Sequence, residues 1–144
     1  MLKTATFIGH KDLLVFDNSK IKNCIEALIK DYGCERFLCG GMGNFDDICA
    51  RTVWELKKAH PHIQNHLVIP YLSFTIQNRF YYDEIIYPAE LEGQFFKKCI
   101  LLRNRYLVDH ANAAICYIDH SWGGAYQTYL YAKSTHIQLF DLKF

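Results

Sequence analysis

Short apolar runs alternate with segments of helical periodicity along the whole chain. The apolar runs are TATFIG (4–9), RFLCGG (36–41), HLVIPYL (66–72), AAICYID (113–119) and HIQLFDL (136–142), and one further short strand is expected at 84–87. Apolar strands of this kind are typical of a sheet that helices cover on both faces. The alternation therefore predicts an α/β domain with a mainly parallel sheet.

Helical segments are expected between these strands. Apolar residues at i, i+3, i+4, i+7 and i+8 begin at Ile21, and Gly33 follows as a C-cap. Further helices are expected from Asn44, as the N-cap, to about residue 60, and at about 91–110 and 124–133. A chain of 144 residues can bury one core, so we expect residues 1–144 to form a single domain.

Composition argues against several classes of protein. Sixteen Lys and Arg against fifteen Asp and Glu give a net charge of +1, which provides no broad basic surface for nucleic acid or a membrane. No apolar run approaches the roughly 20 residues of a membrane-spanning helix, and the first residues lack the features of a signal peptide. We therefore expect a cytoplasmic protein.

Neither the six cysteines nor the stretch HPHIQNH (60–66) forms a metal-binding motif. No two cysteines are spaced as C-x-x-C, and most fall in apolar periodic segments, so we expect reduced, buried thiols. Pro61 prevents a helix that would align the histidines, and no cysteine or acid cluster stands at ligand spacing. We expect an exposed loop at 60–66, and no metal or other cofactor.

Three glycine-bearing loops follow three of the expected strands. They are Gly9-His10-Lys11, Gly40-Gly41-Met42-Gly43-Asn44 and His120-Ser121-Trp122-Gly123-Gly124. In parallel sheets, ligands bind where the carboxyl ends of strands release their loops. Glycine lets backbone N–H groups approach an anion, and a helix N-terminus adds unpaired donors. The loops therefore predict a ligand site, although tight turns alone would also explain their glycines.

The two larger loops differ in the helix that follows each. After Gly43, the first turn carries Asp46, whose carboxylate would repel a phosphate but suits ribose hydroxyls, a base edge or a bridging cation. After Gly124, no acid occupies the first turn, so we expect a phosphate there. Thr128 either adds a hydroxyl to this site or is a surface residue of the helix. His10 and His120 are either ligand contacts or ordinary loop residues.

Arg103 lies on the more apolar side of the long helix, where an arginine needs a partner. A bound anion is one candidate, and a core carboxylate such as Asp46 is the other. Arg105 lies on a different side and is four residues from Asp109, so we expect these two to form a solvated pair.

Acidic residues and tyrosines are interleaved between the third strand and the long helix. The acids include Glu84 and Glu90, and the tyrosines are Tyr81, Tyr82 and Tyr87. Aromatic residues near strand ends can stack a nucleobase, or they can pack a lid onto their own domain.

These residues give the chain a family resemblance. The segments that carry it, in order, are TATFIGHK, CGGMGNFDDICARTVWELK, LVIPYL, RNRYLVDHANAAICYI and HSWGGAYQTYLYAK. Together they resemble the SLOG superfamily, which includes the DNA-processing protein DprA/Smf and the Lonely Guy enzymes, and within it the short stand-alone YpsA-like proteins. The resemblance implies a three-layer Rossmann-like domain, with helices flanking a mainly parallel sheet, that binds nucleotides or nucleotide-derived molecules such as ADP-ribose-like signals.

The resemblance argues against one known activity. Lonely Guy enzymes hydrolyse the N-glycosidic bond of nucleoside monophosphates with an arginine and with a glutamate in P-G-G-x-G-T-x-x-E. The arginine falls on Arg103 and the paired glycines on Gly123 and Gly124, but the glutamate position is Leu130. A leucine cannot stabilise an oxocarbenium-like centre or position a water. An enzyme would need another carboxylate, for which the candidates are Asp46, Glu84 and Glu90.

We therefore expect a binding or sensing module for a nucleotide-derived small molecule, such as a nucleoside phosphate or an ADP-ribose-like ligand. Its phosphate would lie at Gly123 and Gly124 and pair with Arg103, and Asp46 would face the ribose or base. The alternative is a nucleotide hydrolase that cleaves a glycosidic or phosphate bond through a non-standard carboxylate. Nucleic acid is not an expected partner. A homo-oligomer is compatible with Phe95 and Phe96, which give the long helix an apolar face.

Overall fold

The expected strands form one sheet in the computed structural model, which describes residues 1–13 and 17–143. The strands are β1 (Thr4–Gly9), β2 (Arg36–Cys39), β3 (Gln64–Val68), β4 (Glu84–Ile86), β5 (Ala113–Tyr117) and β6 (Gln138–Asp141). The α-helices are α1 (Asn18–Tyr32), α2 (Gly43–Leu56), α3 (Phe96–Asp109) and α4 (Gly124–Lys133). Two short 3₁₀ turns, Arg79–Tyr81 and Ala89–Leu91, flank β4.

All of the strand pairings are parallel, in the order β4-β3-β2-β1-β5-β6. From β1 the chain first builds outward on one side through β2, β3 and β4, and then returns to add β5 and β6 on the other. The strand order therefore reverses between β1 and β5, where Gly9 pairs with Tyr117. In open parallel sheets, the crevice at such a reversal is where ligands bind.

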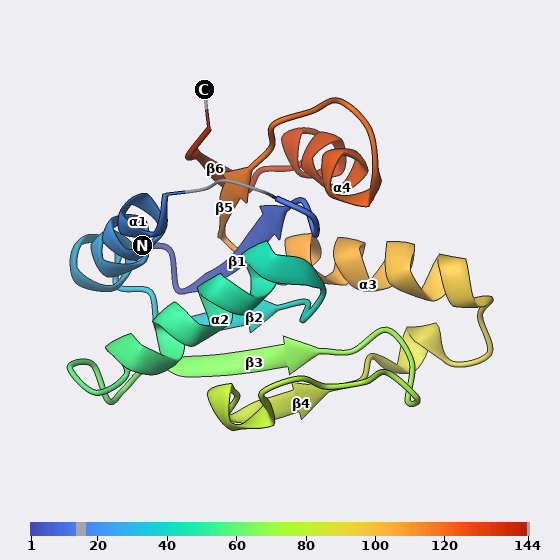
Figure 1. Cartoon of the computed structure of the whole chain (residues 1–144), viewed down its shortest axis with the longest axis horizontal. Helices are drawn as coiled ribbons and strands as arrows, with labels where there is room; N and C mark the ends of the chain where they lie inside the picture. Colours follow the sequence, from blue (N-terminus) through green and yellow to red (C-terminus); the bar gives the residue numbers. More distant parts are fainter. Residues whose placement is uncertain (14–16, 144) are drawn as a thin grey trace.

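Helices cover both faces of the sheet (Figure 1). Successive residues of β1 point to opposite faces, so Phe7 packs in the core beneath α1 and α2, with Ile25 and Val53. Ile8 packs on the other face, with Val108 of α3 and Ala132 of α4. The predicted three-layer Rossmann-like α/β fold is confirmed.

Several expected boundaries differ from the structure. The helix predicted at 91–110 begins only at Phe96, because Gly93 has a left-handed φ of 79° and separates it from the preceding 3₁₀ turn. The helix predicted to reach residue 60 ends at Leu56. Asn44 is not an N-cap: Met42 holds that position, and the Asn44 side-chain amide donates to the Leu13 carbonyl.

The histidine-rich stretch is not wholly an exposed loop, as we had expected. Its last residues lie in β3, where His66 is 6% exposed. The cysteines agree with the prediction, because all six are free thiols and only Cys24 is not fully buried. Burial raises the pKa of the Cys24 thiol to about 11, so the reactive thiolate is disfavoured.

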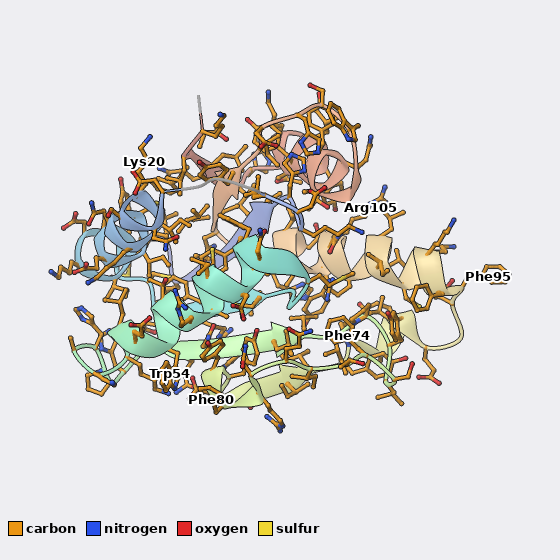
Figure 2. All side chains as sticks on the ribbon, viewed as in Figure 1. Lys20, Trp54, Phe74, Phe80, Phe95 and Arg105 are labelled. Atoms are coloured by element: carbon orange, nitrogen blue, oxygen red, sulfur yellow. The ribbon has the colours of Figure 1, made fainter. Side chains whose placement is uncertain are left out.

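The N-terminal end of α3 carries two exposed apolar side chains. Phe95 and Phe96 are 86% and 61% exposed, and Phe95 projects away from the rest of the molecule (Figure 2). Self-association through this face remains a prediction. No helix within the described residues is long and apolar enough to cross a membrane.

Candidate functional site

A cavity of about 410 Å³ opens at the carboxyl ends of β1, β2 and β5. The predicted residues that line it from the three glycine-bearing loops are Gly9, His10, Gly40, His120, Gly123 and Gly124. Those that line it from helices α2, α3 and α4 are Asp46, Arg103 and Thr128. The cavity therefore brings together most of the predicted ligand-binding residues at the reversal of strand order.

The other predicted residues lie elsewhere. Gly41 and Gly43 line a neighbouring hollow of about 280 Å³, and Ser121 is exposed and is not part of the cavity lining among the described residues. Glu84 is at the start of the edge strand β4, with a carboxylate oxygen 3.3 Å from His66 Nε2. Glu90 is exposed in the turn before α3. Of the three carboxylates considered for catalysis, only Asp46 lies at the cavity.

Not every glycine of these loops is needed for a ligand. A Cβ atom at Gly9 would lie 2.2 Å from the Phe45 ring, so this glycine lets α2 pack closely against the end of β1. Gly123 differs, because a Cβ there would meet nothing within 4 Å among the described residues. Its φ of 93° favours glycine for conformational reasons alone.

The N-terminus of α4 is open towards the cavity. Gly123 is its N-cap, no side chain of the described residues caps it, and no acid lies in its first turn. The first backbone N–H groups of a helix lack intrahelical partners and carry its positive dipole end. The Thr128 hydroxyl donates to the Gly124 carbonyl at 2.9 Å, which leaves the Thr128 oxygen free to accept a hydrogen bond.

No side chain of the described residues caps the N-terminus of α2 either, but two backbone N–H groups there, those of Met42 and Asn44, have partners within the protein. An Asp46 side-chain oxygen accepts from the Met42 backbone N–H at 3.0 Å. Desolvation raises the pKa of Asp46 to about 6, although this hydrogen bond and the nearby Arg103 charge lower it. Asp46 therefore exchanges protons near neutral pH, as acid–base groups in active sites often do.

Arg103 is 1% exposed, and its hydrogen bonds go to groups of the protein, while Asp46, the carboxylate that the sequence suggested, is near enough to act on its charge. Nη1 donates to the carbonyls of Gly40 at 2.7 Å and Val68 at 2.8 Å. Nε donates to Asn104 at 3.0 Å and Nη2 to the Met42 sulfur at 3.0 Å. Burial lowers the pKa of Arg103 to about 10, while Asp46 acts in the opposite direction. One Nη2 donor of this guanidinium, which has five in total, is left for a ligand.

Arg105 and Asp109, which we expected to pair with each other, each contact Tyr131 of α4 instead. The Arg105 guanidinium lies 5.1 Å from the centre of the Tyr131 ring. The Tyr131 hydroxyl donates to Asp109 at 2.6 Å. These contacts join α3 to α4 outside the cavity.

The tyrosines near β4 pack on their own domain. Tyr81 contacts Trp54 of α2, with ring centres 5.5 Å apart, and the Tyr87 hydroxyl donates to Glu92 at 2.8 Å. Tyr82 lines the smaller hollow rather than the cavity. Trp54 and Phe80 lie together at this edge, remote from α4 (Figure 2).

The loops after β1 and β5 contribute a cluster that the sequence did not reveal. The rings of His10 and His120 stack with centres 3.5 Å apart, and Trp122 packs on His120 at 4.0 Å. His120 Nδ1 donates to Asp119 Oδ1 at 2.6 Å, and His10 Nε2 lies 3.6 Å from the same oxygen. Burial lowers the pKa of His10, and the neighbouring His120 acts in the same direction.

Lys11, Asp12 and Trp122 also line the cavity and were not predicted as site residues. Lys11 follows Gly9 and His10 in the same loop, and this position could have identified it as a site residue. Asp119 ends the apolar run of β5, and Trp122 lies between two predicted loop residues. Asp119 and Trp122 lie near His10 only because β1 pairs with β5. The two strands are over a hundred residues apart in the sequence.

The parallel sheet, its order and the glycine-lined cavity at the reversal define a Rossmann-like α/β protein. The family model for YpsA, the YspA SLOG family, matches residues 7–141, and the chain belongs to this family. The SPbeta prophage-derived protein YoqJ of Bacillus subtilis (strain 168) is 30% identical over 94% of this chain and 87% of its own length. The UPF0398 protein BH1768 of Halalkalibacterium halodurans is 29% identical over 90% of this chain and 79% of its own length.

Solved structures share the fold at low identity. DNA processing protein A from Helicobacter pylori superposes with a TM-score of 0.69 at 17% identity, covering 96% of this chain. This chain spans only 64% of the length of that protein. The structural genomics target TM1055 superposes with a TM-score of 0.61 at 13% identity, covering 95% of this chain and 72% of its own.

Membership of the SLOG family indicates a nucleotide-related function. The Helicobacter protein is described as binding single-stranded DNA, a partner that we did not expect for this chain, and at 17% identity the likeness shows a shared fold. At the position of the Lonely Guy glutamate, Leu130 is 42% exposed on α4, and it is not part of the described cavity lining.

Proposed function

We propose that this chain binds or senses a nucleotide-derived small molecule, with the phosphate at the N-terminus of α4. The observation that carries this proposal is an uncapped, acid-free helix N-terminus that opens into a cavity of about 410 Å³. Ligand pockets commonly have volumes of about 300–1,000 Å³, and helix N-termini favour anions.

Side chains around this N-terminus support an anion. Lys11 lines the same cavity, and the spare Nη2 donor of Arg103 supplies a second positive group. Because the other donors of Arg103 are engaged inside the protein, its guanidinium is held in place before a ligand arrives. Such preorganisation reduces the entropy that binding would cost.

The rest of the ligand would lie between Asp46 and the exposed Trp122. Asp46 suits ribose hydroxyls, because a carboxylate accepts two hydrogen bonds from a diol. Trp122 is 68% exposed at the rim, where an indole face can stack a base. This arrangement would hold the phosphate at α4 and the sugar beside Asp46 within one cavity.

The second candidate is a nucleotide hydrolase, and one observation favours it. Asp46 is the only one of the three proposed carboxylates at the cavity, and its pKa of about 6 suits a general acid or base. As a hydrolase, the chain would use Asp46 in place of the missing glutamate. The two candidates differ in whether the ligand survives incubation with the protein.

The test is a binding and turnover assay with AMP, ADP, ADP-ribose and NAD, using calorimetry for affinity and chromatography for products. Gly124→Asp should abolish binding, because it places a negative charge at the phosphate position without a steric clash. Gln127→Asp is the matched control: it adds the same charge to the exposed side of α4, away from the cavity lining. Equal affinities of the two variants would refute the phosphate assignment.

Product analysis then separates the two candidates. An intact ligand recovered after long incubation supports a sensor, whereas free base, ribose phosphate or inorganic phosphate supports the hydrolase. A parallel titration with an oligodeoxythymidine covers the activity described for the Helicobacter protein. Backbone-dominated DNA binding weakens steeply with added salt, while a small ligand in a cavity responds much less.

A further inference from the structure

His10, Asp119 and His120 converge from the loops that follow the two strands at the reversal of the sheet. One ligand-type atom from each lies within 4.8 Å of the other two. The carboxylate of Asp119 is the common point, with Oδ1 at 2.6 Å from His120 Nδ1 and 3.6 Å from His10 Nε2. Two of the three residues, His10 and His120, also line the cavity.

One ring nitrogen of His10 is buried without a hydrogen-bond partner among the described residues. This atom is Nε2, and the His10 side chain is 3% exposed. A buried polar atom without a partner is destabilising, so such atoms are rare unless something binds to them. The His10 ring is buried, and its Nε2 atom lies 3.6 Å from Asp119 Oδ1.

The separations of these atoms resemble those around a bound metal ion. Metal–nitrogen and metal–oxygen bonds of about 2.0–2.2 Å place neighbouring ligand atoms roughly 3–3.5 Å apart. The two distances from Asp119 Oδ1, 2.6 Å and 3.6 Å, lie on either side of this range. An ion would replace the shared proton of the Asp119–His120 hydrogen bond and would also give His10 Nε2 its partner.

We propose that His10, Asp119 and His120 form a binding site for a divalent transition-metal ion. Two imidazoles and one carboxylate suit Zn²⁺, Co²⁺, Fe²⁺ or Mn²⁺, whereas Mg²⁺ and Ca²⁺ prefer oxygen ligands throughout. Three protein ligands leave coordination positions open, and two of the three, His10 and His120, line the cavity. Such an ion would supply positive charge for an anionic group of a ligand held at α4.

One adjustment accompanies binding. Imidazole lone pairs lie in the ring plane, and the His10 and His120 planes are only 17° apart, so one ring must turn to share an ion. His120 is the ring that can turn, because its side chain is 20% exposed on a loop whereas His10 is 3% exposed. Turning His120 changes its contact with Trp122, which gives the binding event an optical signal.

The test is a titration of the purified protein with Co²⁺ and Zn²⁺ in the absence of any nucleotide. Equilibrium dialysis measures stoichiometry, and the visible absorption of bound Co²⁺ reports its nitrogen and oxygen ligands. We expect one ion per chain, and a change in Trp122 emission on adding Zn²⁺ in a Trp54→Phe background. Nucleotide affinity does not enter this measurement, so its outcome is separate from that of the proposed function.

His120→Ala and Asp119→Asn are the informative variants, since both side chains are partly exposed and their loss spares the core. Each should weaken Co²⁺ binding at least about tenfold. The matched control is the double variant His60→Ala and His62→Ala, which removes two other histidines whose rings lie 6.2 Å apart. Binding that is lost in the control and kept in the two loop variants would overturn the proposal, as would the absence of stoichiometric binding to a folded wild-type chain.

Discussion

The loop between β2 and α2 and the loop between β5 and α4 are both glycine-rich turns at the cavity, yet their surroundings are opposite. In the first loop, the Met42 backbone N–H donates a hydrogen bond to Asp46, and Arg103 donates one to the Gly40 carbonyl. In the second, Gly123 and Gly124 are exposed, and a Cβ added at either would meet nothing within 4 Å among the described residues. One loop is closed by the protein's own side chains, and the other is left open.

A glycine-rich motif alone does not reveal whether its backbone groups are free to bind a ligand, but this difference between the loops does. Backbone groups bind a ligand only if no protein group has already satisfied them. The β2–α2 loop is therefore a structural element that positions Asp46 and Arg103, and the β5–α4 loop is the stronger candidate for the anion. Substitutions should accordingly damage folding in the first loop and ligand binding in the second.

The largest effect is expected from Arg103→Ala. The substitution removes the donors to the Gly40 and Val68 carbonyls and leaves Asp46 without its nearby positive charge. Removing one member of such a buried polar set lowers the free energy of unfolding by about 3–5 kcal/mol. Urea denaturation of both proteins measures this difference in the free energy of unfolding.

Arg105→Ala is the matched control on the same helix. Arg105 is exposed and contacts the Tyr131 ring, so its loss should cost less than about 1 kcal/mol. If the two variants were equally stable, Arg103 would not be the residue that closes the β2–α2 loop. A loss of ligand binding by Arg103→Ala alone would not identify a ligand contact, because the fold itself is weakened.

Glycines with similar backbone angles give the next comparison. Gly43 and Gly123 have φ values of 90° and 93°, so alanine costs roughly 1–2 kcal/mol of strain at either position. At Gly43 the added Cβ would also lie 2.3 Å from Lys11 Cα, which adds about 1–3 kcal/mol. Thermal unfolding should therefore rank Gly43→Ala well below Gly123→Ala, and the reverse order would contradict the distinction between the loops.

Asp46 makes the closed loop sensitive to pH. Its pKa is about 6 in the folded protein against 3.8 for a free aspartate, so the folded state binds the proton more tightly than the unfolded state. Stability from this group is thus fully present below pH 3.8 and is lost as pH rises through 6. Relative to Asp46→Asn, the wild type should gain up to about 3 kcal/mol between pH 7 and pH 3.8.

Denaturation curves of both proteins across this pH range measure the difference, and other titrating groups cancel in the comparison. The absolute offset between the two proteins is not the test, because asparagine also changes the environment of Arg103. A difference that is constant with pH, or that shrinks as pH falls, would show that Asp46 is not the desolvated carboxyl that closes the loop.

The sequence predicts local features well where a single residue ends an element. β1 has the bounds of the run TATFIG, and α4 has the bounds expected after the Gly-Gly pair. The helix predicted at 91–110 begins later, at Phe96, because Gly93 adopts a left-handed angle, which periodicity does not register. The contacts of the site were harder to predict, because the partners of Arg103 and the stack of His10 on His120 depend on which strands lie side by side.

The smallest effect is expected at Gly124, and it is the most direct test of the open loop. Gly124 does not have a left-handed φ, and a Cβ there would meet nothing within 4 Å in the described parts of the chain. Gly124→Ala should therefore stabilise the protein by about 0.4–1 kcal/mol, because alanine reduces the freedom of the unfolded chain. If the same variant binds AMP or ADP-ribose more weakly in calorimetry, the glycine serves the ligand at the expense of stability. If it is more stable and binds equally well, the backbone at Gly124 does not contact the phosphate, and the anion site would have to move towards Lys11.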